Sequence, residues 1–417
     1  MKNKKYLKVI GNRPINGVIK ASGSKNAALP IIAASLMCDS QVVLDNVPDI
    51  IDVRNMLGIL SYLNVEYEFK DNRLTINPLT LKKKHLTIDL MNKLRASYYL
   101  IPVLLEENDI LKFSNVGGCN FENRPIDIHL NLLKKVGCNV IQEESNYKIK
   151  LQEFKKLTYN FERKTFGGTI NAILLGLKTK KETSIKNCCY DPEIIDFISF
   201  LKKAGLDINY NDNNVIFSLK TPLKGIQYTI MDDRIEAETL ALIGLSLGRI
   251  GIFDFSKEHH QGFISFLDNN DIVYSLEDNF LVLNKELVTK GNDVELDFYP
   301  CLSTDIGPIL FSYLLLGSKM FLIKDNIYKT RLSKLRFFQS SFCFQNDIIL
   351  VNPNKINKNN DVFYGSNLRD TMAYLFYALT HDGTFYIYGI EHIERGYEKI
   401  IDKLISLNCI VEEINET

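Results

Sequence analysis

The chain has 417 residues, 46% of them hydrophobic, which predicts at least two well-buried domains. Lysine plus arginine and aspartate plus glutamate number 50 each, so no net charge attracts nucleic acid or an anionic membrane, and any anion site must be local. The charged N-terminus lacks a signal-peptide core, and no apolar run reaches about 18 residues, which predicts a cytoplasmic protein without a membrane span.

Six segments share one pattern: an amphipathic helix, then a small or polar residue, then a short strand of alternating character. The helices are predicted to end at Asn64, Gly137, Gly205, Asn270, Ser341 and Asn408. Glycine and asparagine suit such ends because they adopt the left-handed conformation at little cost. A spacing of roughly 65 to 73 residues is far above a solenoid period and predicts six small α/β subdomains in two lobes of three.

Two further segments concern the connection of the lobes. A first strand is predicted at Leu7–Ile19, able to pair with either lobe. The stretch from Pro222 to Met231 has no strong helical period, and we interpret it as the crossing between the lobes.

The segment Ala21–Pro30 places Ser-Lys-Asn just before an apolar helix. Backbone N–H groups at a helix start, together with the ammonium group of Lys25, form a site for phosphate or carboxylate. The segment lacks the spacing of a P-loop. An ordinary helix N-cap is the alternative interpretation of the same tripeptide.

Other cationic residues are spread along the chain: Arg95, Arg124 with His129, Arg369, and Arg395 with His392. Arginine suits bidentate recognition of phosphate and carboxylate. Each arginine taken singly is better explained as a solvated surface charge.

The loop Val116–Pro125 carries two glycines, which let the backbone bend tightly and present Cys119 beside Arg124. Such a cationic neighbour favours a thiolate or a polarised thiol, whereas the alternative is a small buried cysteine. The other seven cysteines are expected to be reduced and inert, and no CxxC or HExxH pattern predicts a zinc site.

Two acidic segments complete the candidates. Asp305 precedes an apolar helix, so it is either a helix cap, a general base or a carboxylate that orients a hydroxyl group. Asp233, Arg234 and Glu236 are better explained as a structural ion-pair network.

Together these segments resemble the enolpyruvyl transferases over nearly the whole chain. The motifs, in order, are Ser-Lys-Asn-Ala-Ala-Leu-Pro, Arg-Ala-Ser, Gly-Gly-Cys, Arg-Pro-Ile-Asp-Ile-His, Asp-Arg-Ile-Glu and Arg-Gly-Tyr-Glu. The resemblance implies an α/β fold of two inside-out α/β barrels, each of three βαβαββ repeats, which agrees with the six repeats. Residues 22–230 would form the first barrel, with the Cys119 loop, and residues 1–21 plus 231–417 the second, with the active site in the cleft between them.

The resemblance also implies an activity: transfer of the enolpyruvyl group of phosphoenolpyruvate to the 3-hydroxyl of UDP-N-acetylglucosamine, with release of phosphate, as the first committed step of peptidoglycan synthesis. No metal or organic cofactor is implied. Cys119 would be the general acid and the target of fosfomycin, and Asp305, Lys25 and Arg395 would share the catalysis. The residues implied for phosphoenolpyruvate are Lys25, Asn26, Arg124, Arg369 and Arg395. Those implied for the UDP-sugar are Arg95, Arg124, Pro125, Ile126, Asp127, Ile128, Arg163, Lys164, Thr165, Phe166, Asp305 and Ile327.

The chain departs from the family pattern at a few positions. Asn367 stands where the family has an aspartate thought to join in proton transfer, and an amide cannot take that proton at neutral pH. The other departures are Glu122 for a loop glycine, Arg163 for lysine, Asp191 for glutamate and Glu238 for glycine. A reduced but real activity is therefore predicted. The alternatives are an enolpyruvyl transferase with another acceptor and an impaired paralogue that binds UDP-sugars.

Overall fold

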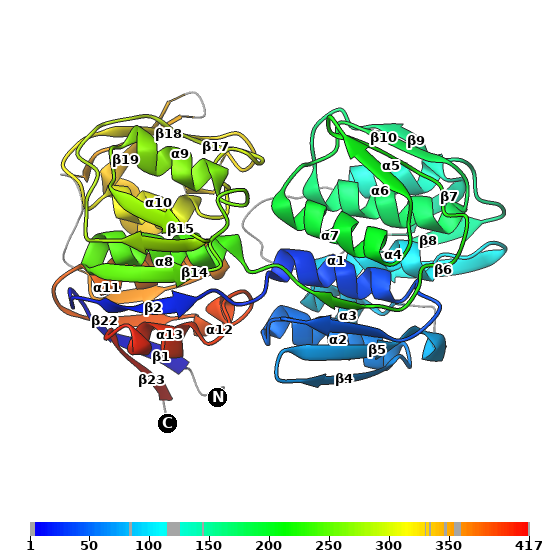
Figure 1. The fold of residues 1–417 in the computed structure, drawn as a ribbon, viewed down its shortest axis with the longest axis horizontal. Helices are drawn as coiled ribbons and strands as arrows, with labels where there is room; N and C mark the ends of the chain where they lie inside the picture. Colours follow the sequence, from blue (N-terminus) through cyan, green and yellow to red (C-terminus); the bar gives the residue numbers. More distant parts are fainter. Residues whose placement is uncertain are drawn as a thin grey trace. The chain divides into compact units, whose positions relative to one another are not determined.

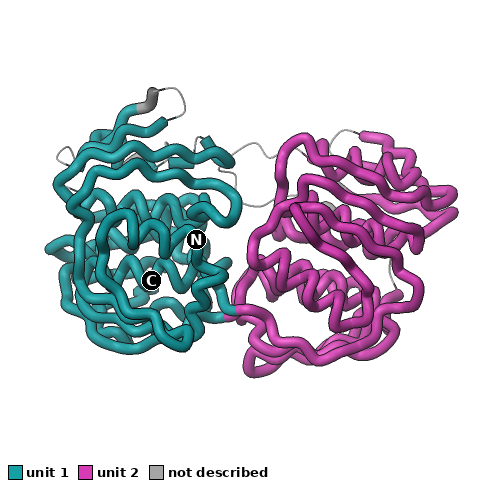
Figure 2. Tube along the Cα trace, turned by 45° about the horizontal axis from the view of Figure 1, so that its top comes forward, with its two compact units in different colours: residues 1–22, 232–417 teal, residues 23–231 magenta. Residues whose placement is uncertain are grey.

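The computed structural model describes residues 5–82, 86–114, 126–143, 146–329, 331–332, 335–345, 348–353 and 360–415. The chain divides into two compact units (Figure 2). Unit 1 comprises Met1–Ser22 and Asp232–Thr417, and unit 2 comprises Gly23–Met231. Among the described residues, no helix is both long and apolar enough to cross a membrane.

Unit 2 holds three sheets within its described residues (Figure 1). In order across each sheet, their strands are β13 (Gln227–Thr229), β3 (Val42–Asp45), β5 (Arg73–Asn77) and β4 (Glu66–Lys70); β6 (Asp109–Ser114), β8 (Asn146–Leu151) and β7 (Cys138–Glu143); and β11 (Ile208–Asn211), β12 (Asn214–Phe217), β10 (Thr183–Lys186) and β9 (Thr158–Asn160). Its helices are α1 (Lys25–Ser35), α2 (Ile51–Tyr62), η1 (Pro78–Thr80), α3 (Ile88–Lys93), η2 (Arg95–Tyr99), α4 (Leu100–Leu104), α5 (Asp127–Lys135), α6 (Phe166–Thr179) and α7 (Pro192–Lys203).

Unit 1 also holds three sheets among its described residues. In order across each sheet, their strands are β21 (Val362–Tyr364), β22 (Thr384–Tyr388), β1 (Lys5–Ile10) and β23 (Ile410–Asn415); β15 (Tyr274–Glu277), β16 (Phe280–Leu283), β14 (Arg249–Phe253) and β2 (Asn16–Lys20); and β17 (Val294–Leu296), β18 (Phe321–Asp325), β20 (Ile348–Val351) and β19 (Phe342–Gln345). Its helices are α8 (Arg234–Leu247), α9 (Gln261–Asn269), α10 (Gly307–Leu314), η4 (Arg336–Ser341), α11 (Leu368–Thr380), α12 (Ile390–Ile393) and α13 (Ile400–Ser406).

The sheets repeat one topology. In the last sheet of unit 1, β17 pairs parallel with β18, β18 pairs antiparallel with β20, and β20 pairs antiparallel with β19. With α10 and η4 as the connecting helices, this is a βαβαββ unit. Strands from distant parts of the chain complete three other sheets in the same pattern: β1 pairs with β22 and β23, β2 pairs with β14, and β13 pairs with β3.

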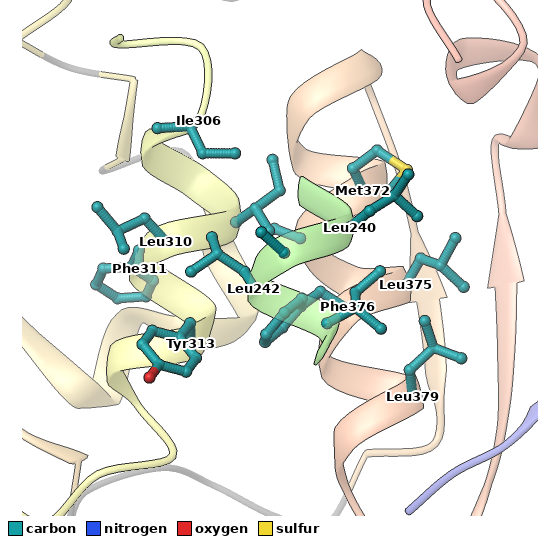
Figure 3. Packing of buried hydrophobic residues seen from close by; sticks show 14 of the residues in the cluster. Leu240, Leu242, Ile306, Leu310, Phe311, Tyr313, Met372, Leu375, Phe376 and Leu379 are labelled. Atoms are coloured by element: carbon teal, nitrogen blue, oxygen red, sulfur yellow. The ribbon is translucent and has the colours of Figure 1, made fainter. Parts of the chain in front are cut away.

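In unit 1 the sheets lie toward the outside, and helices α8, α10 and α11 lie in the middle of the unit (Figure 1). In unit 1, α8, α10 and α11 pack against one another through buried Leu240, Leu310, Met372 and Phe376 (Figure 3). All fourteen residues of α8 are buried, as expected of a helix surrounded by protein. The strands alternate instead, as in β18, where Phe321 and Ile323 are buried and their neighbours exposed, because one sheet face meets the helices and the other meets water.

Four of the six predicted helix ends carry a left-handed residue at the predicted position. Asn64, Gly137, Gly205 and Asn408 all have positive φ angles, between 63° and 103°. At the fourth repeat the prediction is wrong by one residue, since Asn270 has φ −102° and the left-handed residue is Asp271. Ser341 is the last residue of η4 and is followed by extended backbone, so no left-handed residue ends that helix.

The prediction of one strand at Leu7–Ile19 is also wrong. The segment forms β1 and β2, which belong to different sheets. Asn12, in the left-handed conformation at φ 51°, lies in the segment that separates them. The stretch Pro222–Met231 contains β13, and the chain passes from unit 2 to unit 1 after Met231.

The carboxylate of Asp196 forms hydrogen bonds with the end of the stretch Pro222–Met231. Asp196 of α7 accepts hydrogen bonds from the Tyr228 hydroxyl group, at 2.6 Å, and from the Met231 N–H group, at 3.3 Å. Burial raises the pKa of Asp196 to about 6, although both hydrogen bonds act in the opposite direction. The folded chain therefore binds this proton more tightly than the unfolded chain, and the resulting stabilisation is lost as the pH rises through about 6.

We predict that Asp196→Asn removes this pH dependence while its amide oxygen still accepts from Tyr228. Relative to the native chain, the free energy of unfolding of the variant should rise by on the order of 1 kcal/mol between pH 4 and pH 7. Urea unfolding of both proteins at the two pH values measures the difference, and parallel pH profiles would contradict the assignment.

Candidate active site

In unit 1 the carboxylate of Asp305 lies between two guanidinium groups. Its Oδ2 accepts from Nη2 of Arg369 at 2.7 Å, and its Oδ1 accepts from Nη1 of Arg331 at 2.8 Å. The side chains of Arg369 and Arg331 are only 11% and 5% exposed. Each carboxylate oxygen thus accepts from one arginine, and the three charges form one cluster in which both arginines are buried and the Asp305 side chain is 26% exposed.

These contacts decide the charge of Asp305. Burial by itself would raise its pKa, but Arg369 and Arg331 outweigh this effect and hold the pKa of Asp305 well below its ordinary value. Asp305 is therefore ionised at neutral pH. A carboxylate with such a depressed pKa is a weak base, so the geometry favours the orienting role over that of general base.

Asp305 does not act as a helix cap. The N-cap residue of α10 is Ile306, and the carboxylate turns to the arginines instead. The preceding residue, Thr304, donates to the carboxylate of Asp325 at 2.5 Å, and Asp325 accepts from the N–H group of Ile327 at 2.9 Å. This links the Asp305 loop to the backbone at Ile327, a second predicted UDP-sugar contact.

Asn367 caps helix α11. Its side-chain oxygen accepts from the N–H groups of Arg369, at 3.0 Å, and Asp370, at 3.2 Å, while Asp370 accepts from the N–H group of Asn367 at 2.9 Å. These bonds form a capping box. The residue that departs from the family pattern thus has a structural role at the start of the helix that carries Arg369.

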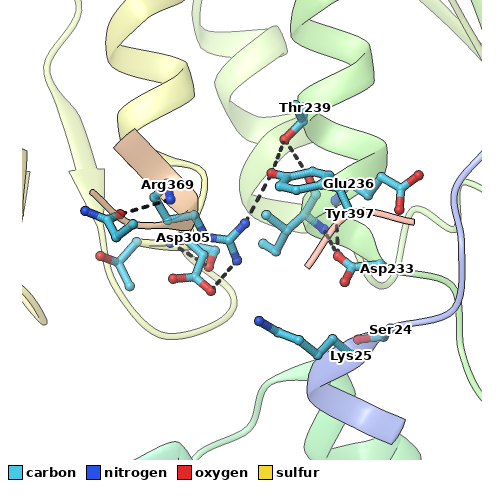
Figure 4. A network of polar contacts seen from close by, with 12 residues as sticks. Ser24, Lys25, Asp233, Glu236, Thr239, Asp305, Arg369 and Tyr397 are labelled. Atoms are coloured by element: carbon cyan, nitrogen blue, oxygen red, sulfur yellow. Dashed lines mark hydrogen bonds and ion pairs between the residues drawn. The ribbon is translucent and has the colours of Figure 1, made fainter. Parts of the chain in front are cut away.

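Arg395 is half-buried in the turn after α12, two residues before the buried Tyr397. The hydroxyl group of Tyr397 lies 3.1 Å from Nη1 of Arg369 and 3.0 Å from the hydroxyl group of Thr239 (Figure 4). The network therefore connects the turn that bears Arg395 with Arg369 and with α8.

At the start of α8, Asp233 is the N-cap, accepting from the N–H groups of Ile235 and Glu236. Glu236 forms an ion pair with Lys403. Glu238, a residue that departs from the family pattern, is buried 3.0 Å from Nδ1 of His260. We assign these acidic residues to the structure of the unit.

In unit 2, Lys25 is the first residue of α1, and Ser24 caps this helix by accepting from the N–H group of Ala27. The Lys25 side chain is 16% exposed, and its ammonium group lies 3.2 Å from the buried carboxylate of Asp52. Asn26 follows in the first turn of α1. Lys25 is thus both a helix-start residue and a cation oriented by a neighbouring helix, α2.

A second group of predicted residues in unit 2 gathers around an aromatic stack. The Tyr98 ring is stacked on His129 at 5.0 Å, and the guanidinium carbon of Arg95 lies 5.9 Å from the same ring. Burial, and then the charge of Arg95, lower the pKa of His129 to about 4, so this histidine is neutral at physiological pH. Its Nδ1 lies 2.7 Å from the Asn171 amide nitrogen and therefore accepts from it.

The start of α5 and the start of α6 lie together beside this stack. Ile126 is the N-cap residue of α5, and Asp127 and Ile128 begin the helix. Thr165 caps α6 by accepting from the N–H group of Gly168, and a Cβ atom at Gly168 would lie 3.1 Å from Ile128. The guanidinium group of Arg163 is 4.0 Å from Asp127, on an exposed surface. Lys164 and Phe166 flank Thr165.

Three predicted site residues, Cys119, Arg124 and Pro125, lie outside the described residues, as does Glu122, so their assignments stay predictions. Sequence reasoning missed the contact of Asp52 with Lys25, the contact of Arg331 with Asp305, and the role of Tyr397. Only Tyr397 had a signal, as part of the Arg-Gly-Tyr-Glu motif. Asp52 and Arg331 lie far along the chain from the residues they contact, in segments that carry no motif.

We predict that Asp305→Asn destabilises the native fold, because two buried arginines lose their anion. The free energy of unfolding should fall by roughly 2–4 kcal/mol at pH 7. Since the pKa of Asp305 is depressed in the folded chain, its stabilisation is present above the ordinary pKa of 3.8 and is lost at more acid pH. The difference from the native chain should therefore shrink as the pH falls below about 4.

Chemical unfolding between pH 3 and pH 7 measures this effect. The control is Asp49→Asn, which breaks the exposed pair of Asp49 with Arg54 and should cost less than about 1 kcal/mol. Equal losses for the two variants at pH 7 would refute the buried cluster.

Comparisons with known proteins agree with this fold and these motifs. The family model of EPSP synthase (3-phosphoshikimate 1-carboxyvinyltransferase) matches residues 9–296. A UDP-N-acetylglucosamine 1-carboxyvinyltransferase of Halothermothrix orenii is 30% identical over 98% of this chain and 99% of its own length. Proteins of the same name from Kosmotoga olearia and Wolbachia sp. subsp. Brugia malayi are 31% and 32% identical, over 97% and 94% of this chain and 98% and 96% of theirs.

Solved structures share the fold. The enolpyruvyl transferase NikO from Streptomyces tendae has a TM-score of 0.87 and 16% identity, with 100% of both chains covered. EPSP synthase from Acinetobacter baumannii has a TM-score of 0.75 and 14% identity, over 99% of this chain and 100% of its own. The two units are accordingly inside-out α/β barrels of three βαβαββ repeats each, and the chain belongs to the enolpyruvyl transferase family.

Proposed function

We propose that this protein transfers the enolpyruvyl group of phosphoenolpyruvate to the 3-hydroxyl group of UDP-N-acetylglucosamine, with release of inorganic phosphate, as a step of peptidoglycan synthesis. The observation that carries the proposal is a sequence identity of 30–32%, over at least 94% of the chain, to proteins named for this reaction. The proposed location is the cytoplasm, and the free thiols of the seven described cysteines fit such a reducing compartment.

The proposed reaction is an addition followed by an elimination. The 3-hydroxyl group loses its proton as its oxygen bonds to the central carbon of phosphoenolpyruvate, and the carbon–carbon double bond opens as the methylene carbon gains a proton, for which Cys119 is the predicted donor. One proton therefore leaves the hydroxyl group for each proton that the methylene carbon gains. Loss of a proton from the resulting methyl group and of inorganic phosphate from the central carbon then gives the enolpyruvyl sugar. The reaction consumes no oxidant or reductant, so the residues need only bind, orient and move protons.

For phosphoenolpyruvate we propose Lys25, Asn26, Arg124, Arg369 and Arg395. Phosphoenolpyruvate carries a phosphate and a carboxylate, and charge gathers on both in the transition state, so cations fixed before binding stabilise it most. The contacts of Lys25 with Asp52, and of Arg369 with Asp305, support this function because they restrict both side chains before substrate arrives. The roles of Arg124 and Cys119 are carried by the sequence alone.

For the UDP-sugar we propose the cluster in unit 2 made by Arg95, residues 124–128 and residues 163–166, together with Asp305 and Ile327 of unit 1. The helix starts of α5 and α6 supply N–H groups and positive partial charge for a diphosphate. Asp305, kept ionised by its two arginines, would accept a hydrogen bond from the 3-hydroxyl group and so orient that oxygen toward phosphoenolpyruvate.

Two alternatives remain as outcomes of the test. An impaired UDP-sugar-binding paralogue is favoured by one observation, the amide of Asn367 at a position where the family has a carboxylate. An enolpyruvyl transferase with another acceptor, such as 3-phosphoshikimate, is favoured by the family model of EPSP synthase that matches residues 9–296.

We predict that purified protein releases phosphate from phosphoenolpyruvate only when UDP-N-acetylglucosamine is present, and that mass spectrometry detects the enolpyruvyl sugar nucleotide. Coupled phosphate detection with each substrate alone provides the control. Absence of turnover, with UDP-N-acetylglucosamine still binding by calorimetry, would refute the activity and favour the paralogue or another acceptor.

We predict that Asn367→Asp raises the rate of phosphate release by about tenfold or more, because a carboxylate can accept a proton that the amide cannot. Aspartate caps a helix as well as asparagine does, and its negative charge is favourable at a helix start, so α11 and Arg369 should stay in place. Asn367→Ser is the matched control, since serine preserves the cap but supplies no carboxylate. A rate for Asn367→Asp no higher than that of the native chain would count against a role in proton transfer at this position.

A further inference from the structure

The buried hydroxyl group of Tyr397 joins three elements of unit 1. Tyr397 lies in the turn after α12, and its hydroxyl group contacts Arg369 at the start of α11 and Thr239 in α8 (Figure 4). The residue is 3% exposed. No role in the reaction described above falls to Tyr397, although it is in direct contact with a residue that has one.

The direction of these hydrogen bonds follows from the number of hydrogens. The Thr239 hydroxyl group has a single hydrogen and donates it to the Ile235 carbonyl oxygen at 2.7 Å. In the 3.0 Å contact with Tyr397, threonine must therefore accept and the phenol must donate. The phenol oxygen is then left as the acceptor for Nη1 of Arg369 at 3.1 Å, since a guanidinium group can only donate.

Arg369 is consequently held at both ends of its guanidinium group. Nη1 donates to Tyr397 and Nη2 donates to Asp305 at 2.7 Å. Two bonds from the terminal nitrogens fix the plane of the group as well as its position, whereas one bond would leave it free to rotate about that contact. The phenol itself is held by Thr239, whose helix lies in the packed interior of the unit.

We propose that Tyr397 is a positioning residue that fixes the Arg369 guanidinium group against Asp305 in the geometry required for the reaction with phosphoenolpyruvate. This inference rests on the proposed function and deepens it. Burial raises the pKa of Tyr397 to about 12, so the phenol keeps its proton and the order of donors and acceptors holds across physiological pH.

Tyr397→Phe isolates the hydroxyl group. The guanidinium carbon of Arg369 lies 5.8 Å from the Tyr397 ring centroid, and phenylalanine retains that ring. A hydrogen bond to a charged group is the stronger kind, so we expect kcat/KM for phosphoenolpyruvate to fall by about ten- to a hundredfold. The matched control is Tyr313→Phe, which removes another buried hydroxyl group of unit 1, bonded to the Glu286 carbonyl oxygen at 2.7 Å, and should change kcat/KM less than about twofold.

A double-mutant cycle separates positioning from general stabilisation. If Tyr397 acts through Arg369, then Tyr397→Phe should have no further effect on kcat/KM in the Arg369→Ala background. Thr239→Val retains the phenol but removes the acceptor of its hydrogen bond. This substitution should lower kcat/KM in the native background but have no further effect in the Arg369→Ala background. Thermal melting of each variant identifies any that fails to fold, and Thr239→Val then replaces Tyr397→Phe in the cycle. Equal losses in both backgrounds would overturn the proposal.

The same double-mutant cycle can be repeated with the affinity for phosphoenolpyruvate as the measured quantity. Calorimetry in the presence of UDP-N-acetylglucosamine gives this affinity, and the measurement requires no turnover. A native chain that binds but does not react would refute the proposed function alone, and the positioning role is then decided by the binding cycle. A loss of affinity in Tyr397→Phe that disappears in Arg369→Ala supports positioning. An unchanged affinity in Tyr397→Phe, or no binding by the native chain, would overturn it.

Discussion

The site in unit 1 depends on one interaction, the carboxylate of Asp305 shared by two buried arginines. A guanidinium group cannot lose its proton in a protein, so burying it without an anion is costly. Arg369 and Arg331 hold Asp305 ionised, and Asp305 in turn makes their burial tolerable.

The repeat architecture explains why these charges meet. Asp305 precedes α10, Arg369 follows Leu368 in the first turn of α11, and Asp233 caps α8, the helix that carries Thr239. The three inner helices pack along their leucines and phenylalanines, and Thr239, Tyr397, Arg369 and Asp305 are connected near their starts. Helix starts carry partial positive charge, which adds to the field of the arginines. The apolar core of the unit thereby sets the position of its polar site.

In unit 2 the same principle acts with different residues. Lys25 begins the inner helix α1 and contacts Asp52 of α2, and Thr165 caps α6 beside the start of α5. His129 of α5, stacked on Tyr98, is neutral and so adds no charge beside the start of α6. In each unit the groups proposed to bind anions thus lie at the beginnings of helices, of which α1 and α6 are buried along most of their length whereas α5 keeps an exposed face.

The sequence by itself determined the repeats, most helix ends and the identity of the charged candidates, because helical periodicity and left-handed glycine or asparagine are local properties of the chain. It failed where pairing between distant segments decides the structure: β1 and β2 are separate strands only because each joins a different sheet. The same limit applies to the site. Only the tertiary structure revealed the contacts of Arg331 and Asp52, and the hydroxyl group of Tyr397 as an acceptor for Arg369. Buried charges pair with groups that are close in space, and these partners are 26 to 28 residues apart along the chain, or 64 for Asp305 and Arg369.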